Sequence, residues 1–520
     1  MRIVLKMQEP NAAPSHETLN FAVYRDEENP SYRDNLFIRA LPPVPTLEAA
    51  FDALAHRPAD RRDDFRTLDA PSRIDLLGQL QQVFVPTQQH IAALQKVVAL
   101  VRACYEYRNP DRPEVQRCLY KSHKGLPAQI GRLSPTGGGS NGMVLWGVTG
   151  AGKTSFVDRL AEYLGNNPIY HRMVQGGASL WPQIPMLRIQ CKSTLRGTSY
   201  ALLQHLDQQL HMTHYSRLNV RWNRDDFLVK IQQAISIHFV GVLVIEDIHK
   251  LKDNAGVILE FLCDIMEECG IPVIAVSTYK FRPALIADPS VASKLTAKGV
   301  IDFEPLLFLP SSSSQSEGDP VESDEGSNAA AVSADWVRFV EALFNLNVFR
   351  HAVEMPAALP SWLHFHTMGV RRFAREMLVA AFERSVHDES ITNIDLALLD
   401  SIAANELQKY QEAIHVLRRR SLGEPIGNDE AARFEHLLPP KDGLDSLAKQ
   451  IEIRDKELTG ATATASAPKK PRPSKATTKP LTGGLKPAPR KATTAKPRNA
   501  KPRTADEVYE GLAASGKIAG

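Results

Sequence analysis

The sequence predicts an α/β fold built on a parallel, doubly wound sheet, and three observations predict it. Short apolar runs typical of buried strands recur between residues 143 and 309. Helical patterns separate these runs, as crossover helices separate the strands of a parallel sheet. A glycine-rich motif follows the first run at residues 147–155. An apolar strand, a glycine-rich turn and an amphipathic helix in this order are typical of a phosphate-binding unit.

We expect a five-stranded sheet with four crossover helices. The expected strands are 143–146, 186–190, 242–246, 271–277 and 299–309, and the expected helices are 153–164, 198–211, 225–238 and 255–268. Helical patterns from Thr46 to Tyr107 precede the sheet, and helical patterns from 334 to 420 predict a small all-α domain after it.

Composition shifts along the chain predict its domain organisation. The predicted segments are an N-terminal region (1–135) with a polar and aromatic stretch at 21–43, the α/β core (136–310), an acidic insert (311–333), a helical lid (334–420), a helical connector (421–460), a basic tail (461–504) and a C-terminal docking peptide (505–520). The Ser-rich acidic insert and the Ala, Thr, Pro and Lys-rich tail have too few apolar residues to form a core, so both are expected to be disordered.

The charge of the chain is very unevenly spread. The net charge is +3, but 12 Lys and Arg and no acid lie between Lys469 and Arg503, which leaves 3 − 12 = −9 for the rest. Such a tail would contact the phosphates of double-stranded DNA without reading their sequence. The alternative for this segment is a solubilising linker.

The N-terminus and the cysteines indicate in which cellular compartment the protein works. The N-terminal "MRIVLKMQEP" has too short an apolar run for a signal peptide, and no stretch of about 18 apolar residues follows it. The five cysteines form no Cys-x-x-Cys pair, which argues against a disulfide framework and a zinc site. We therefore expect a cytoplasmic protein that makes no membrane contact.

The motif "GVTGAGKTS" matches the phosphate-loop pattern G-x-x-x-x-G-K-[ST]. Its glycines would let backbone N–H groups close around phosphates, and the following helix N-terminus adds positive potential. Lys153 would reach the β- and γ-phosphates of ATP, and the Thr154 hydroxyl would bind Mg²⁺. The predicted nucleotide-binding residues are Gly147, Val148, Thr149, Gly150, Ala151, Gly152, Lys153, Thr154 and Ser155.

The stretch "VLVIEDIHKL" places two acids at the end of a predicted strand. Glu246 takes the position that holds Mg²⁺, and Asp247 takes that of the carboxylate that polarises the attacking water. The usual order is Asp then Glu, so each side chain differs in length by one methylene. Misplacement by about an ångström can cost roughly a hundredfold in rate, which favours slow hydrolysis. The alternative is a surface turn that happens to carry two acids.

Two further groups are candidates for contact with the γ-phosphate. Thr278, after Ser277, ends the strand in "IAVSTYK". In "TMGVRRFAREML" three arginines follow a glycine on a predicted lid helix, and Arg372 is the first choice over Arg371 and Arg375. The alternative for these arginines is a solvated helix face.

Taken together, these motifs resemble an AAA+ ATPase, and more specific stretches resemble TnsC, the regulator family of heteromeric (TnsABC-type) cut-and-paste transposons. The matching stretches are "VYRDEENPSYRDNLFIRALPP" (23–43), "YRNP" (107–110), "NNPIYHR" (166–172), "GVLVIEDIHKL" (241–251), "GIPVIAVSTYKFR" (270–282) and "ITNIDLALL" (391–399). The resemblance covers roughly residues 20–420.

The resemblance implies an ATP-controlled protein that assembles as a homo-oligomeric ring or filament on target DNA. It would receive a signal from a target-selection protein, recruit and activate the transposase, and disassemble on hydrolysis. It further implies partner binding by the signature at 21–43, roles for Lys153 and Thr154 at the nucleotide and Mg²⁺, and a sensor role for Thr278.

The resemblance implies DNA-stimulated turnover, and two departures from the family pattern favour slow turnover. One is the order of the acids. The other is the arginine finger, because no arginine lies between Arg282 and Arg338. Lys294 or Lys298 would supply charge there without the planar fork of a guanidinium. The alternatives are a non-hydrolysing, ATP-gated scaffold on DNA and another DNA-associated AAA+ protein such as a helicase loader.

The final stretch "ADEVYEGLAASG" regains apolar residues at helical spacing. Val508, Tyr509 and Leu512 would be the anchors of a short docking helix, displayed by the tail for the transposase.

Overall fold

The computed structural model describes residues 19–57, 67–126, 130–134, 141–172, 180–215, 217, 222–251, 255–303, 333–346, 348–351, 353–422 and 424–439. Residues 1–18 of the N-terminal region, the acidic insert up to residue 332, the connector from residue 440, the basic tail and the docking peptide lie outside these residues. None of the described helices is both long and apolar enough to cross a membrane.

The predicted five-stranded parallel sheet is confirmed. Its strands are β1 (Gly142–Gly147), β4 (Met186–Gln190), β5 (Val242–Glu246), β6 (Val273–Val276) and β7 (Val300–Phe303). Their order is β4-β5-β6-β1-β7, and every neighbouring pair runs parallel. The last expected strand (299–309) is described only as far as Phe303, and its residues 304–309 lie outside the described residues.

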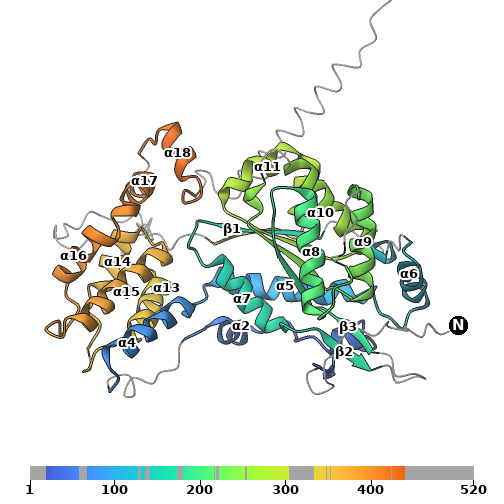
Figure 1. Ribbon diagram of the computed structural model, residues 1–520, viewed down its shortest axis with the longest axis horizontal. Helices are drawn as coiled ribbons and strands as arrows, with labels where there is room; N and C mark the ends of the chain where they lie inside the picture. The colour runs from blue at the N-terminus through green and yellow to red at the C-terminus, as the bar shows by residue number, and fades with distance from the viewer. Residues whose placement is uncertain are drawn as a thin grey trace, which may run out of the picture. The chain divides into compact units, whose positions relative to one another are not determined.

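Helices cover both faces of this sheet (Figure 1). They are α5 (Gln88–Glu106), α7 (Lys153–Leu164), α8 (Leu195–Gln209), α9 (Arg224–Ile237), α10 (Ala255–Cys269), α11 (Arg282–Ala287) and α12 (Pro289–Leu295). Helices α8, α9, α10 and α12 pack in sequence beside one another, while α5 packs on α7 and β7. Because both faces are covered, β1, β5 and β6 are buried throughout and are apolar without alternation.

A short antiparallel hairpin, which the sequence did not predict, stands apart from the sheet. It pairs β2 (Ile169–Arg172) with β3 (Leu180–Gln183). An isolated bridge joins Phe21 to Tyr170, so the start of the described chain lies against this hairpin.

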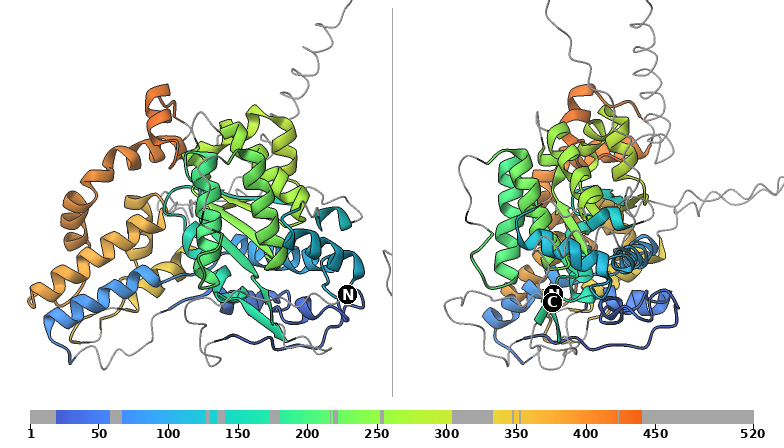
Figure 2. Two further views of the ribbon diagram at one scale, coloured as in Figure 1. Left: turned by 45° about the vertical axis from the view of Figure 1, so that its right-hand side comes forward. Right: turned by 90° about the vertical axis from the view of Figure 1, so that its right-hand side faces the viewer.

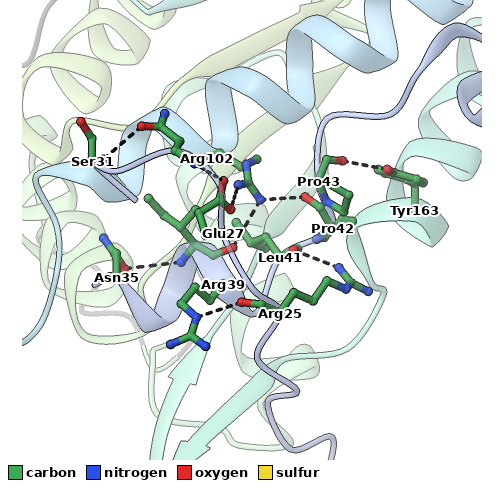
Figure 3. Close-up of polar contacts among 12 residues, drawn as sticks. Arg25, Glu27, Ser31, Asn35, Arg39, Leu41, Pro42, Pro43, Arg102 and Tyr163 are labelled. Carbon is green, nitrogen blue, oxygen red and sulfur yellow. Dashed lines mark hydrogen bonds and ion pairs between the residues drawn. The ribbon is translucent and has the colours of Figure 1, made fainter. Parts of the chain in front are cut away.

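The polar and aromatic stretch at 21–43, here called the N-terminal clip, is held together by its own side chains (Figure 3). Arg25 donates to the carbonyl oxygen of Leu41 at 3.0 Å, and Arg39 Nε donates to the carbonyl oxygen of Arg25 at 2.9 Å. The clip contains the short helix α1 (Leu36–Arg39), which Asn35 caps. The stretch is therefore a compact loop rather than an open arm.

The N-terminal clip is also bound to two core helices (Figure 3). Arg102 of α5 forms an ion pair with Glu27 and donates to the carbonyl oxygen of Pro42 at 3.1 Å. Tyr163 of α7 donates through its hydroxyl to the carbonyl oxygen of Pro43 at 2.8 Å. Three of the seven charged residues of the clip, Arg25, Glu27 and Arg39, thus make contacts that hold the fold, and binding of a partner by this stretch stays a prediction.

Helices after the sheet form a second core. The pattern from 334 to 420 predicts all of them but the last, which lies at Asn428–Phe434 in the predicted connector (421–460). They are α13 (Ala334–Phe344), α14 (Leu359–Thr367), α15 (Arg371–His387), α16 (Leu396–Glu406), α17 (Gln411–Ser421) and α18 (Asn428–Phe434). Below, this cluster is called the lid.

The N-terminal region contributes to both cores. Helix α2 (Leu47–Leu54) packs on α5 and α7, whereas α4 (Ala70–Leu77) packs on α15 of the lid, as Figure 2 shows. Leu77, Leu80, Val83 and Val85 are buried among the lid side chains. The chain therefore crosses from lid to sheet core between Val85 and α5.

Candidate nucleotide site

The phosphate loop lies between β1 and α7, where the sequence predicts it. Gly150 and Gly152 have φ angles of 88° and 100°, which favour glycine over residues with a side chain. A Cβ atom at Gly150 would lie 2.7 Å from Cβ of Arg372, so this glycine also lets the lid approach the loop. The N-terminus of α7, which starts at Lys153, faces the region where phosphates would lie.

A cavity of about 330 Å³ lies beside the loop. Its polar lining comes from the loop, from the ends of β5 and β6 and from the start of α15: Thr149, Gly150, Gly152, Lys153, Thr154, Ser155, Glu246, Asp247, His249, Ser277, Thr278, Arg371, Arg372 and Arg375. Its apolar lining comes from Val83, Phe84, Val276 and Phe339. This combination suits a ligand with an anionic part and an apolar ring.

Lys153 is held by the backbone of its own loop. Its ammonium group donates to the carbonyl oxygens of Gly147 at 2.9 Å and Val148 at 2.8 Å. Burial lowers the pKa of Lys153 to about 8, although Asp247 and Asp302 oppose the shift. Phosphate oxygens would take the place of the two carbonyls, and their negative charge would restore the ammonium form.

Glu246 is only 6% exposed and is bound by a cation from the neighbouring strand. Arg188 of β4 donates through Nε to Glu246 Oε1 and forms a second ion pair with Asp158 of α7. An isolated arginine inside the apolar run "MLRIQ" was the available sequence signal for this contact, and sequence reasoning missed it. Glu246 therefore has a charged partner before any metal arrives.

Replacing Arg188 by alanine is expected to destabilise the protein by about 3 kcal/mol near neutral pH, because the buried Glu246 carboxylate loses its partner. Mg²⁺ and ATP should recover part of this loss, since a cation returns to the carboxylate. Thermal unfolding with and without Mg-ATP measures both effects. Arg117→Ala, which breaks the exposed pair with Glu114, is the control and should change stability by under about 1 kcal/mol. An unchanged melting temperature for Arg188→Ala would contradict the assigned contact.

Asp247 has a left-handed backbone conformation, with φ 58° and ψ 32°. Its carboxylate is 37% exposed and lies 2.7 Å from the ammonium of Lys250. Asp is several-fold enriched at positive φ compared with most residues, because its short polar side chain tolerates this conformation. The order Glu then Asp thus has a local structural reason, which the sequence pattern did not reveal.

Two hydroxyls at the end of β6 are buried without a partner. Ser277 Oγ and Thr278 Oγ1 make no hydrogen bond to any residue that the structure describes. Both residues line the cavity. Unsatisfied buried hydroxyls are costly, so their place beside the phosphate loop indicates a polar ligand there.

The three lid arginines have different surroundings. Arg371 is buried and donates to the carbonyl oxygen of Val85 at 2.9 Å, and burial lowers its pKa to about 10. Arg375 donates to the carbonyl oxygen of Val83 at 3.0 Å. These two arginines join the lid to the chain segment before α5. Arg372, paired with Glu376 at 2.9 Å and more than half exposed, keeps the freedom to turn toward a phosphate.

Lys294, a candidate to replace the arginine finger, is engaged within its own chain. Lys294 Nζ lies 2.5 Å from Glu267 Oε1, and the hydrogen bond to this carboxylate raises the pKa of Lys294. For Lys298, the structure gives only a backbone bond to Gly142. Neither lysine lines the cavity of its own subunit.

A family model described as an AAA domain matches residues 138–285. These residues include the phosphate loop, both acids and Thr278. Together with the sheet, the match confirms the predicted AAA+ phosphate-loop core. A domain of this class generally binds ATP with Mg²⁺ and hydrolyses it.

Two solved structures give distant similarities. The Aeropyrum pernix ORC1 protein in complex with DNA is 15% identical, covering 67% of this chain and 82% of that chain, with a TM-score of 0.33. A Thermotoga maritima RuvB variant is 12% identical, covering 68% of this chain and 93% of that chain, with a TM-score of 0.30. No curated protein matches the sequence.

Proposed function

We propose that the chain binds ATP in this cavity and hydrolyses it slowly. The observation that carries the proposal is the pair of buried, unpartnered hydroxyls at Ser277 and Thr278 beside an intact phosphate loop. Lys153 would hold the β- and γ-phosphates, and Arg372 would contact the γ-phosphate from the lid. Asp247 would orient the attacking water. Thr154 and Glu246 would hold Mg²⁺, which screens the charge of the phosphates.

We further propose that the protein is a DNA-bound regulator of transposition. It would assemble on double-stranded target DNA in the ATP state, link a target-selection protein to the transposase, and disassemble on hydrolysis. The resemblance of the N-terminal clip and of five later stretches to the TnsC family supports this role, as does the basic tail. Slow hydrolysis suits it, because the oligomer must outlast the arrival of the transposase.

The first experiment measures ATP turnover with and without duplex DNA, together with DNA binding in ATP and ADP. If the protein assembles on DNA with ATP and disassembles on hydrolysis, DNA should stimulate turnover, and DNA should bind more tightly in ATP than in ADP. The rival, a non-hydrolysing scaffold, is favoured by the ion pairs that engage both acids, and it predicts ATP-dependent DNA binding without turnover. A helicase loader would instead capture a replicative helicase in a pulldown. A protein that neither turns over ATP nor binds DNA in a nucleotide-dependent way would contradict the proposal.

Neutralising the tail is expected to weaken DNA binding and its salt dependence. Changing the 12 Lys and Arg between residues 469 and 503 to Gln keeps the length of the segment and removes its charge. Each lost phosphate contact lowers the slope of log affinity against log salt by about 0.9. A tenfold or larger loss of affinity at about 0.1 M salt is expected, with ATP binding unchanged. An unchanged salt slope would favour the solubilising linker.

A further inference from the structure

The segment after the lid reaches the phosphate loop. Residues 428–439 follow α17, and Leu437 and Leu438 are buried among the lid side chains. Arg420 donates to the carbonyl oxygen of Pro439 at 2.9 Å, and Leu437 N–H donates to the carbonyl oxygen of Phe434 at 2.8 Å. These contacts fix the backbone on both sides of His436.

His436 is bound directly to the loop. The Thr149 N–H donates to the carbonyl oxygen of His436 at 2.9 Å, and the Thr149 hydroxyl lies 3.4 Å from the same oxygen. Thr149 is itself part of the cavity lining. A residue far along the chain is thus held one hydrogen bond away from the nucleotide site.

The imidazole of His436 lies in positive surroundings. Its Nδ1 atom is buried and has no hydrogen-bond partner among the described residues, and the same is true of His249, which lines the cavity. Burial lowers the pKa of His436, and the charges of Lys280, His249 and Lys153 lower it further. The imidazole of His436 therefore lies close enough to the phosphate-loop lysine to be influenced by its charge.

We propose that His436 binds the terminal phosphate of the nucleotide held by its own subunit. The proposal rests on the ATP site described above. It adds to this site a residue that lies outside the AAA domain match (138–285) and follows the last lid helix. ATP would offer His436 a γ-phosphate oxygen, and ADP would not. The residue therefore distinguishes the two nucleotides and passes the difference to the chain that continues beyond Pro439.

The test compares two affinities in three variants. Calorimetry measures the binding of ADP and of a non-hydrolysable ATP analogue, both with Mg²⁺, to the natural protein and to His436→Ala, His436→Gln and His415→Ala. His415 is an exposed histidine on α17 and serves as the matched control. We expect His436→Ala to bind the analogue about tenfold more weakly, the factor that one hydrogen bond to a charged group commonly contributes, with ADP changed by under about twofold.

His436→Gln keeps a donor and should recover part of the affinity for the analogue, which a purely structural role would not predict. Equal losses for ADP and the analogue, or no loss, would overturn the inference. Failure of the natural protein to bind either nucleotide would instead refute the proposed function. If the variants unfold, the test is the rate at which diethyl pyrocarbonate modifies His436 in the natural protein. The inference requires that the ATP analogue slows this modification more than ADP does.

Discussion

Lys153→Ala is expected to lower ATP turnover by about 10²–10³-fold. The ammonium would neutralise charge on both the β- and the γ-phosphate throughout the reaction, and removing one such donor commonly costs this much. The fold should survive, because Lys153 bonds only to carbonyl oxygens of its own loop. Steady-state turnover and nucleotide titration measure the loss.

The control for this variant is Lys124→Ala, at an exposed lysine that follows α6 (Pro113–His123). It removes the same charge away from the cavity and should leave turnover within about twofold. Full activity of Lys153→Ala would mean that the loop binds no phosphate in this protein.

The lowered pKa of Lys153 also predicts a pH dependence. With a pKa of about 8, Lys153 loses its proton as the pH rises above 8, and binding of ATP must return it. Affinity should therefore fall by up to about tenfold per pH unit above pH 8, with proton uptake detected by calorimetry in buffers of different ionisation enthalpy. For folding the sign is opposite. The unfolded chain holds this proton up to pH 10.5, so the cost of burying Lys153 is present below pH 8 and is relieved between pH 8 and 10.5.

Asp247→Asn is expected to lower hydrolysis by about 10²–10³-fold while ATP binding stays within a few-fold of the natural value. Asparagine tolerates the left-handed backbone at this position as aspartate does, so only the charge that orients the attacking water is removed. Single-turnover hydrolysis and nucleotide titration separate the two effects. Lys250→Ala is the control, because it removes the ion-pair partner of Asp247 and leaves the carboxylate in place.

The double change Glu246→Asp with Asp247→Glu should gain nothing. It restores the usual order of acids but places glutamate in a left-handed conformation, at a cost of about 1–2 kcal/mol, and shortens the side chain that Arg188 holds. Revived turnover in this double variant would instead show that the natural order silences the enzyme.

Much of the core could be predicted from the sequence, because local patterns specify it. The apolar runs of β1, β4 and β5 and the loop before α7 need only period, length and glycine placement to be found. The surroundings of the acids could not be predicted in this way. Arg188 pairs with Glu246 across 58 residues, and His436 reaches Thr149 across 287, so only the folded chain brings them together.

The left-handed conformation of Asp247 also escaped prediction, since no turn signature surrounds it. The same limit explains the unexpected hairpin, whose strands have four residues each and no alternation strong enough to detect. Val83 and Phe84 were missed as part of the cavity because their positions depend on packing between α4 and the lid.

The sharing of the N-terminal region between two cores has a consequence for synthesis on the ribosome. Arg73 is buried against the carbonyl oxygen of Val348, a partner 275 residues later in the chain. At about 5–20 residues per second, roughly 14–55 s pass between the translation of these two residues. Throughout that interval Leu77 and Leu80 have no partner surface to cover them. The nascent chain therefore needs a chaperone, or must aggregate more slowly than it is translated, so that its first helices can still pack against the lid when the lid emerges.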